Sequence, residues 1–313
     1  MEQPDFTICI AHRGNGLGLW ATIMSCEHDL KGSGFTWNYS VVCNGDKRLD
    51  NGAHVLLDSL DKQGKVVYQH FTCDAMSPPD ARQLASNHAN GRILCFFDNH
   101  CLVHKDYFKR VHLDFGKYDI GLLHSTTEFM PGEAFNYSYR LTLKRNFWAM
   151  SDSICANSHK PFRCAAGGHG GFAVLNETWK EMGGYGPEKL FIGYAGEELT
   201  TDLRFWMRGK EVWLDPLLIH THYVGYRGYA RHYSDDYYIN LMVSANILGG
   251  MPWLETVAAS FLQQPRRHSG MTMFDLMQVA YHRSKDFAAE VQGTAKMSLE
   301  ELLTYFREHC IPY

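Results

Sequence analysis

The sequence predicts an α/β fold in which helices flank a mixed, mainly parallel sheet, followed by a helical C-terminal subdomain. Three observations support this prediction. In the first third of the chain, short apolar runs alternate with helical segments, which is typical of a parallel sheet covered on both faces. One of these runs is apolar throughout, as in a fully buried strand. Beyond about residue 226 the pattern becomes helical.

The first elements follow from this alternation. The apolar run from Phe6 to Ala11 predicts a strand, and a glycine-containing loop over residues 12–16 ends it. The run from Leu17 to Cys26 predicts a helix. A second strand is expected from Trp37 to Cys43, because the turn signal Asn44-Gly45-Asp46 follows it directly.

A helix and a buried strand come next. Asp80 suits the N-terminal position of a helix that runs to Ala89, and Asn90-Gly91 ends it. The stretch from Arg92 to Phe97 is continuously apolar after its first residue, which predicts a strand buried on both faces.

The middle of the chain gives fewer signals. We expect strands at Tyr118–His124 and Glu211–Asp215, and a helix at Glu197–Arg208 whose apolar residues share one stripe. Gly209 stands just past the end of that helix. Residues 125–165 give mixed signals and predict no element.

The last part reads as helices at Asp235–Leu248, from Met273 to Tyr281 and beyond, and at Leu299–Cys310. Ser298 and Glu301 stand at capping-box spacing at the start of the last one. We therefore divide the chain into a first domain over 1–225 and a helical subdomain over 226–313.

Composition excludes some classes of protein. The chain has 30 basic and 34 acidic residues, so a strongly basic surface for nonspecific nucleic-acid binding is not expected. The nine cysteines are scattered without a CxxC pair, which favours buried free thiols. No basic-then-apolar leader and no apolar run of about 18 residues is present. The expectation is a protein without a membrane span in a reducing, cytoplasmic compartment.

A candidate metal site follows the buried strand. Asp98 and His100 come directly after it, and ligands of open α/β sheets bind at the carboxyl ends of strands. A divalent cation held there can offset the charge of a leaving diphosphate. Mixed oxygen and nitrogen ligands suit Mn²⁺ better than Ca²⁺, and Mg²⁺ is the alternative cofactor. A strand-end aspartate also often caps the next turn, so the motif alone leaves a structural role open.

Two further clusters carry candidate chemistry. Glycines at 167, 168, 170 and 171 permit close backbone approach to a ligand, with Gly168 the candidate contact, or simply form a hairpin. Glu197 and Glu198 open a helix, where the dipole stabilises carboxylates in any case. As a functional alternative, Glu198 is a general base that removes the proton of an acceptor hydroxyl, Glu197 orients the acceptor, and Asp202 is a second candidate base.

The fourth motif is His220-Thr221-His222. Residues two apart in an extended segment face the same side, so both imidazoles can reach one site. A lone histidine is usually structural, whereas this pair is a moderate metal signal.

Taken together and in order, these motifs resemble the GT-A (Rossmann-like) glycosyltransferases. ILCFFDNHCLVHKDYF is similar to the metal-binding DxD or DxH stretch of the polypeptide N-acetylgalactosaminyltransferases. The block from GGHGGFAVLNETW to GEELTTDLRFWMRGK is similar to one that those enzymes share with the β-1,4-galactosyltransferases and the family 2-like group. The resemblance covers roughly residues 6 to 230.

The resemblance implies a role for each matching residue. Asp98 and His100 match the metal-binding pair, and His222 the third metal-binding histidine, with His220 as the fallback. Glu197 matches the glutamate of a G-E-(D/N) motif, and the carboxylate of Glu198 favours an inverting mechanism. The donor contacts would come from residues 1–100, namely from Ala11, His12, Arg13, Asp46 and Arg82, together with Asp98 and Gly168, and residues 101–225 would form the acceptor and metal half.

The implied activity is transfer of a sugar from a nucleotide sugar, UDP-sugar above all, to an acceptor hydroxyl. A glycan, a lipid-linked intermediate, a protein and a hydroxymethylated DNA base stay open as acceptors. Arg227 and Arg231, interleaved with Tyr226 and Tyr229, would suit a polyanion such as DNA. Two other classes also stay open: a nucleotidyltransferase, although residues 12–18 lack a lysine, and a non-catalytic sugar- or nucleotide-binding module.

Overall fold

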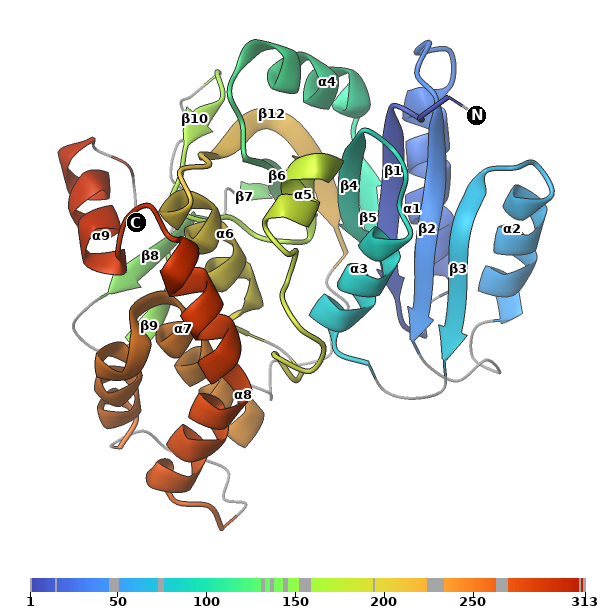
Figure 1. Cartoon of the computed structure of the whole chain (residues 1–313). Helices are drawn as coiled ribbons and strands as arrows, with labels where there is room; N and C mark the ends of the chain where they lie inside the picture. The colour runs from blue at the N-terminus through green and yellow to red at the C-terminus, as the bar shows by residue number, and fades with distance from the viewer. Residues whose placement is uncertain are drawn as a thin grey trace.

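The computed structural model describes residues 2–14, 16–44, 51–72, 76–130, 133–135, 138–142, 146–151, 159–193, 195–223, 234–262, 270–309 and 311. These residues form a ten-stranded mixed sheet, a separate hairpin and helices on both faces of the sheet (Figure 1). The predicted α/β class is therefore confirmed. Within the described residues, no helix is both long and apolar enough to cross a membrane.

The N-terminal half is a parallel sheet in the order β4-β1-β2-β3. Its strands are β1 (Phe6–His12), β2 (Trp37–Asn44), β3 (Val66–Thr72) and β4 (Ile93–Asp98). The helices α1 (Gly16–Leu30), α2 (Asn51–Asp61) and α3 (Pro78–Asn87) connect them. The predictions of β1, α1, β2, α3 and β4 are confirmed to within a few residues, whereas α2 and β3 were not predicted.

Strand β4 shows why the sheet is buried on both faces. Ile93, Cys95 and Phe97 pack into one core cluster with α1 and α2, while Leu94 and Phe96 pack into the other with α3. All five side chains are fully buried. Burial of each large apolar side chain contributes about 1.5–3 kcal/mol, which requires an apolar residue at every position of such a strand.

The other half of the sheet is mixed. Strand β11 (Gly171–Leu175) runs antiparallel to β4 and to β6 (Leu122–Met130), and β12 (Val212–His222) runs parallel to β6. The short strands β5 (Cys101–Val103), β7 (Glu133–Phe135) and β10 (Phe162–Arg163) pair along these, and β8 (Ser138–Thr142) with β9 (Asn146–Ser151) forms the hairpin. The helices of this half are α4 (Tyr107–Lys117), α5 (Asn176–Glu181) and α6 (Glu197–Met207).

Strand β12 is longer than the five residues predicted from the sequence. Its register with β6 shifts between Asp215 and Ile219, and Pro216 lies in this irregular stretch. A proline cannot donate to a ladder but is tolerated at a bulge, so pairing resumes and continues to His222.

The C-terminal helices lie at the end of the molecule opposite β3 (Figure 1). They are α7 (Asp235–Ser260), α8 (Met273–Thr294) and α9 (Leu299–Glu308), close to the predicted positions, and α9 has the predicted capping box. Helix α7 breaks at Gly250 (φ 73°, ψ −165°), and the Gln292 amide donates to the carbonyls of Asn246 (2.9 Å) and Ile247 (3.3 Å) there.

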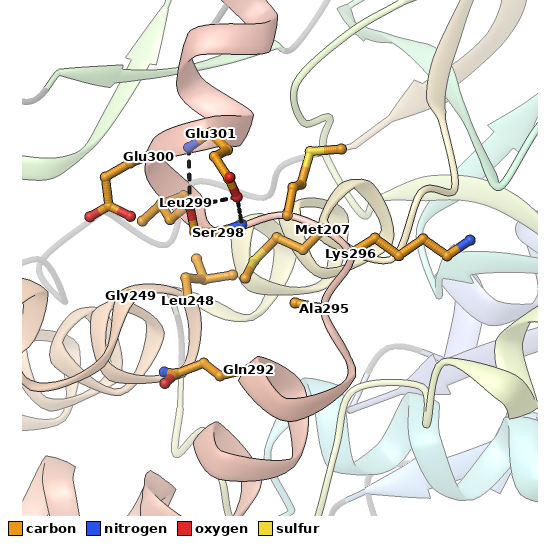
Figure 2. Close-up of a pocket in the computed structure, with 11 residues that line it drawn as sticks. Met207, Leu248, Gly249, Gln292, Ala295, Lys296, Ser298, Leu299, Glu300 and Glu301 are labelled. Atoms are coloured by element: carbon orange, nitrogen blue, oxygen red, sulfur yellow. Dashed lines mark hydrogen bonds between the residues drawn. The ribbon is translucent and has the colours of Figure 1, made fainter.

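A cavity of about 300 Å³ lies beside this break, between α6, α7 and the start of α9 (Figure 2). Apolar side chains of Met207, Leu248 and Leu299 line it together with Lys296 and Glu300. None of the candidate site residues lines it.

The cysteines of the described residues match the expectation of buried thiols. Free and buried thiols are found at Cys9, Cys26, Cys43, Cys95, Cys101 and Cys164.

Candidate active site

Two strand ends bring three candidate metal ligands together. Strand β4 ends at Asp98, the turn Asn99-His100 follows, and β5 starts at once. Strand β5 then pairs antiparallel with the end of β12, which sets His222 opposite Cys101. The Tyr223 N–H donates to the His100 carbonyl at 3.0 Å and fixes this register.

Asp98, His100 and His222 therefore form one cluster, with a ligand atom of each within 4.8 Å of the others. Asp98 Oδ2 lies 3.1 Å from His222 Nε2, and the two imidazole rings are 4.5 Å apart. His100 Nδ1 lies 3.1 Å from the Asn99 amide oxygen, so the Nδ1–H donates to that oxygen. In the neutral ring, Nε2 then keeps its lone pair available to bind a cation.

The donor set fits a divalent cation. It offers one carboxylate and two imidazoles, and the Asn99 amide supports His100 as an outer-shell group does in metal sites. Gly170 approaches the cluster so closely that a Cβ there would lie 3.3 Å from the His222 ring.

Arg82 of α3 supplies the opposing charge. Its guanidinium is buried and donates to Asp98 Oδ1 at 2.5 Å. Burial acts to raise the pKa of the Asp98 carboxyl, but Arg82 and His222 outweigh it and hold the pKa well below its usual range. Burial lowers the Arg82 pKa, but the charge of Asp98, with contributions that include Glu198, raises it well above its ordinary value. The site thus holds a stable ion pair.

His220 lies apart from this cluster although it is two residues from His222. It is fully buried, with Nδ1 2.8 Å from Ser125 Oγ and Nε2 3.4 Å from Thr127 Oγ1. Burial and the charge of His222 lower its pKa to about 3. Of the two histidines, His222 groups with Asp98 and His100.

The glutamates open α6 after a strained turn. Ala195 has φ 91° and Gly196 φ 89°, a conformation that residues other than glycine rarely adopt. Glu198 Oε1 accepts from the His169 backbone N–H at 3.1 Å. Glu197 is buried, and burial together with the Glu198 carboxylate raises its pKa.

Asp202, the second candidate base, is enclosed. It is fully buried, and its oxygens accept from His124 Nε2 (2.9 Å), His169 Nε2 (3.0 Å) and the Gly167 N–H (2.7 Å). Neither His124 nor His169 was predicted from the sequence as a site residue. A histidine inside the glycine-rich loop was the available signal for His169, whereas His124 ends a predicted strand and carried none.

Of the donor-side residues, Ala11 and His12 lie at the end of β1 beside the end of β4. Ala11 pairs with Asp98 in the sheet register, His12 is buried with Nδ1 2.8 Å from the Asn99 amide nitrogen, and Arg13 is exposed. The Gly168 carbonyl lies 3.3 Å from His124 Nδ1. Asp46 lies outside the described residues.

Comparison of the whole fold with solved structures is consistent with this geometry. The chain is similar to GalNAc-T7, solved with UDP, GalNAc and Mn²⁺, at 14% identity and a TM-score of 0.66, over 92% of this chain and 57% of that one. It is also similar to residues 1–349 of S. aureus TarS, at 13% identity and a TM-score of 0.50, over 97% of this chain and 78% of that one. No protein-family model and no curated protein sequence matches.

Both neighbours are GT-A-type glycosyltransferases, and the chain has their fold. It spans a little over half the length of the GalNAc-T7 structure. The resemblance drawn from the motifs is therefore confirmed at the level of the fold.

Proposed function

We propose that the chain is a glycosyltransferase that moves a sugar from a UDP-sugar to an acceptor hydroxyl, with Mn²⁺ (or Mg²⁺) held by Asp98, His100 and His222. The observation that carries the proposal is the meeting of these three ligands at the carboxyl edge of a GT-A sheet. The bound cation would stabilise the negative charge of the leaving nucleoside diphosphate.

The residues around the cluster take the remaining roles. Arg82, already charged and buried beside Asp98, would face the donor phosphates, which an arginine fork binds well. Ala11, His12, Arg13 and Gly168 would form the donor cleft, and Asp46, outside the described residues, is proposed to contact the base. The similarity to GalNAc-T7, solved with UDP and Mn²⁺, supports this choice of donor and metal.

Glu198 is the proposed general base. Its side chain is partly exposed, so it can accept a proton from an acceptor hydroxyl. The His169 backbone N–H donates to its Oε1 and fixes the orientation of the carboxylate. Glu197 would orient the acceptor, since its Oε2 is buried without a hydrogen-bond partner among the described residues. A base on the acceptor side is what an inverting transfer requires.

The acceptor remains a choice between a glycan, a lipid-linked intermediate, a protein and a hydroxymethylated DNA base. The residues proposed to decide it, Tyr226 to Arg231, lie outside the described residues.

A donor screen tests the function. The protein is incubated with each common nucleotide sugar and Mn²⁺, and nucleotide release is measured. Release from one UDP-sugar, lost in EDTA and restored by Mn²⁺, is the expected result. No release from any donor at any metal concentration would contradict the proposal.

A further inference from the structure

A buried polar cluster in the described part of the chain lies behind the proposed general base without supplying a catalytic group itself. It comprises His124 on β6, His169 in the loop over residues 167–171, Tyr185 after α5, and Asp202 on α6. The first, second and last are fully buried and Tyr185 is 2% exposed. Buried polar groups are costly unless each is paired, so their bonding needs an explanation.

The hydrogen bonds fix where the protons lie. Asp202 accepts from both imidazole Nε2 atoms, so His169 carries a proton on Nε2. Burial lowers the pKa of His169, which is therefore the neutral form with Nδ1 as an acceptor. Tyr185, whose hydroxyl oxygen is 2.8 Å from that Nδ1, donates to it.

His169 is thereby connected to the candidate active site at two points. Its backbone N–H donates to Glu198 Oε1 at 3.1 Å. Its ring binds the Tyr185 hydroxyl at 2.8 Å, and the Tyr185 backbone N–H donates to Gln83 Oε1 at 2.7 Å, which ties this cluster to α3 at the residue that follows Arg82. Arg82 in turn binds Asp98.

We propose that His169 is a positioning residue, anchored by Asp202 and Tyr185, that sets the Glu198 carboxylate and the Arg82 guanidinium relative to each other. The inference rests on the proposed function, in which these two groups serve the acceptor and the donor. Asp202 is then the anchor of His169 and not a base.

A metal ion held by the cluster is the competing explanation, because ligand atoms of His124, His169 and Asp202 lie within 4.8 Å of one another. The hydrogen bonds of the cluster argue against a bound metal ion. Unlike Asp98, which is partly exposed, Asp202 is fully buried, and besides two imidazole N–H groups its oxygens receive the backbone N–H of Gly167, a fixed donor that a cation would displace.

A double-mutant cycle tests the connection. Tyr185→Phe removes the hydroxyl, and His169→Gln keeps an amide donor toward Asp202 but loses the Nδ1 acceptor. Each should lower kcat/KM for the donor by about ten-fold, the scale of one hydrogen bond near a charged group. The double variant should lose no more than either single one, because all three lack the same bond.

Tyr39→Phe is the matched control. The Tyr39 hydroxyl is also buried and donates to Glu27 Oε1 at 2.9 Å, in the other core cluster. This variant should lose stability with kcat/KM unchanged. Equal behaviour of Tyr185→Phe and Tyr39→Phe, or additive losses in the cycle, would overturn the proposal.

Imidazole ¹⁵N NMR separates this inference from the proposed function. His169 should appear as the neutral Nε2–H tautomer, and its Nδ1 signal should shift in Tyr185→Phe. A protein that releases no nucleotide but shows this tautomer refutes the function and keeps the hydrogen-bond network. The opposite tautomer of His169 would overturn the hydrogen-bond network. So would one bound zinc ion per chain that is retained in Asp98→Asn and lost in His124→Gln, because that ion would occupy the buried cluster.

Discussion

Arg82 and Asp98 set the charge of the candidate site. The guanidinium is almost fully enclosed, whereas the carboxylate keeps a quarter of its side-chain surface exposed. A cation approaching Asp98 therefore meets a ligand whose negative charge is already partly offset, and His100 and His222 must supply the rest of its binding.

Asp98→Asn tests this arrangement. We expect nucleotide release to fall by at least about 10²-fold, the scale of a lost electrostatic contribution to the transition state. The variant should fold but lose about 1–3 kcal/mol, because the buried Arg82 loses a charged partner but can still donate to an amide oxygen. Activity assays with Mn²⁺ titration and thermal unfolding measure both.

Asp29→Asn is a suitable control for Asp98→Asn. Asp29 accepts from the backbone N–H groups of Asp106 and Phe108, away from the cluster, so its loss should affect stability alone. An Asp98→Asn protein with full activity in EDTA would remove the metal from the proposal.

Glu198→Gln addresses the base. Transfer should fall on the order of 10²-fold or more while donor binding, followed by calorimetry, stays near normal. Wild-type transfer by Glu198→Gln beside an inactive Asp202→Asn would mean that the wrong carboxylate had been chosen. Normal transfer by both, with the product anomer matching the donor's, would indicate a retaining reaction without this base.

At the scale of the elements, the loop over residues 167–171 is tightly constrained by its neighbours. A Cβ on Gly167 would lie 2.3 Å from the His124 ring, and one on Gly171 2.7 Å from the His220 ring. Gly167→Ala should therefore destabilise the protein by about 1–3 kcal/mol. Gly116→Ala in α4, where a Cβ meets nothing within 4 Å, should be neutral or stabilise by about 0.5 kcal/mol. Equal melting temperatures for the two variants would contradict this packing.

Helix α4 contributes a pH-dependent contact with β12. Burial and the Asp215 carboxylate raise the pKa of Asp114 to about 7. Between about pH 4, where an unfolded aspartate titrates, and pH 7, the folded state binds more protons, so stability falls as the pH rises. Asp114→Asn mimics the protonated form and should stabilise by on the order of 1–2 kcal/mol at pH 8 but little at pH 4.

Denaturant unfolding at the two pH values measures this difference, and the exposed Asp58 provides the matched substitution. A stabilisation by Asp114→Asn that is the same at pH 4 and pH 8 would show that the carboxyl does not titrate as described.

Helix α4 also shows what a local reading of the sequence misses. Its N-cap Asp106 has φ 64° and makes no side-chain cap bond. The cap comes from Asp29 of α1, whose carboxylate accepts from the N–H groups of Asp106 (2.6 Å) and Phe108 (3.0 Å). By contrast α9, which carries its own capping box, was predicted from sequence. Helices with a local start signal are predictable, and those capped through the tertiary structure are not.

At the scale of the whole molecule, one apolar cluster joins the sheet to the C-terminal helices. It contains Phe96 of β4, Trp206 of α6 and Phe306 of α9, all at most 2% exposed. We therefore expect a single calorimetric transition, and a loss of about 3–5 kcal/mol in Phe306→Ala. Two separated transitions, with Phe306→Ala affecting only one, would show independent units instead.

The sequence predicted individual residues of the candidate site better than the contacts between them. The strand-end position of Asp98 and the spacing to His100 were visible in the sequence, and the family resemblance pointed to His222. Neither could reveal Arg82 binding Asp98, or Asp202 enclosed by two histidines, because these contacts join residues 16 to 78 positions apart through packing.

The pairing of β5 with β12 has a consequence for folding kinetics. Asp98 and His222 are 124 residues apart, so the cluster cannot exist until that long loop has closed, a contact of the kind that forms slowly. Cation binding would then detect only the fully folded protein and no folding intermediate that lacks the β5–β12 pairing. Since Mn²⁺ would bind only the closed form, it should slow unfolding and leave the folding rate unchanged if the β5–β12 ladder forms after the rate-limiting barrier.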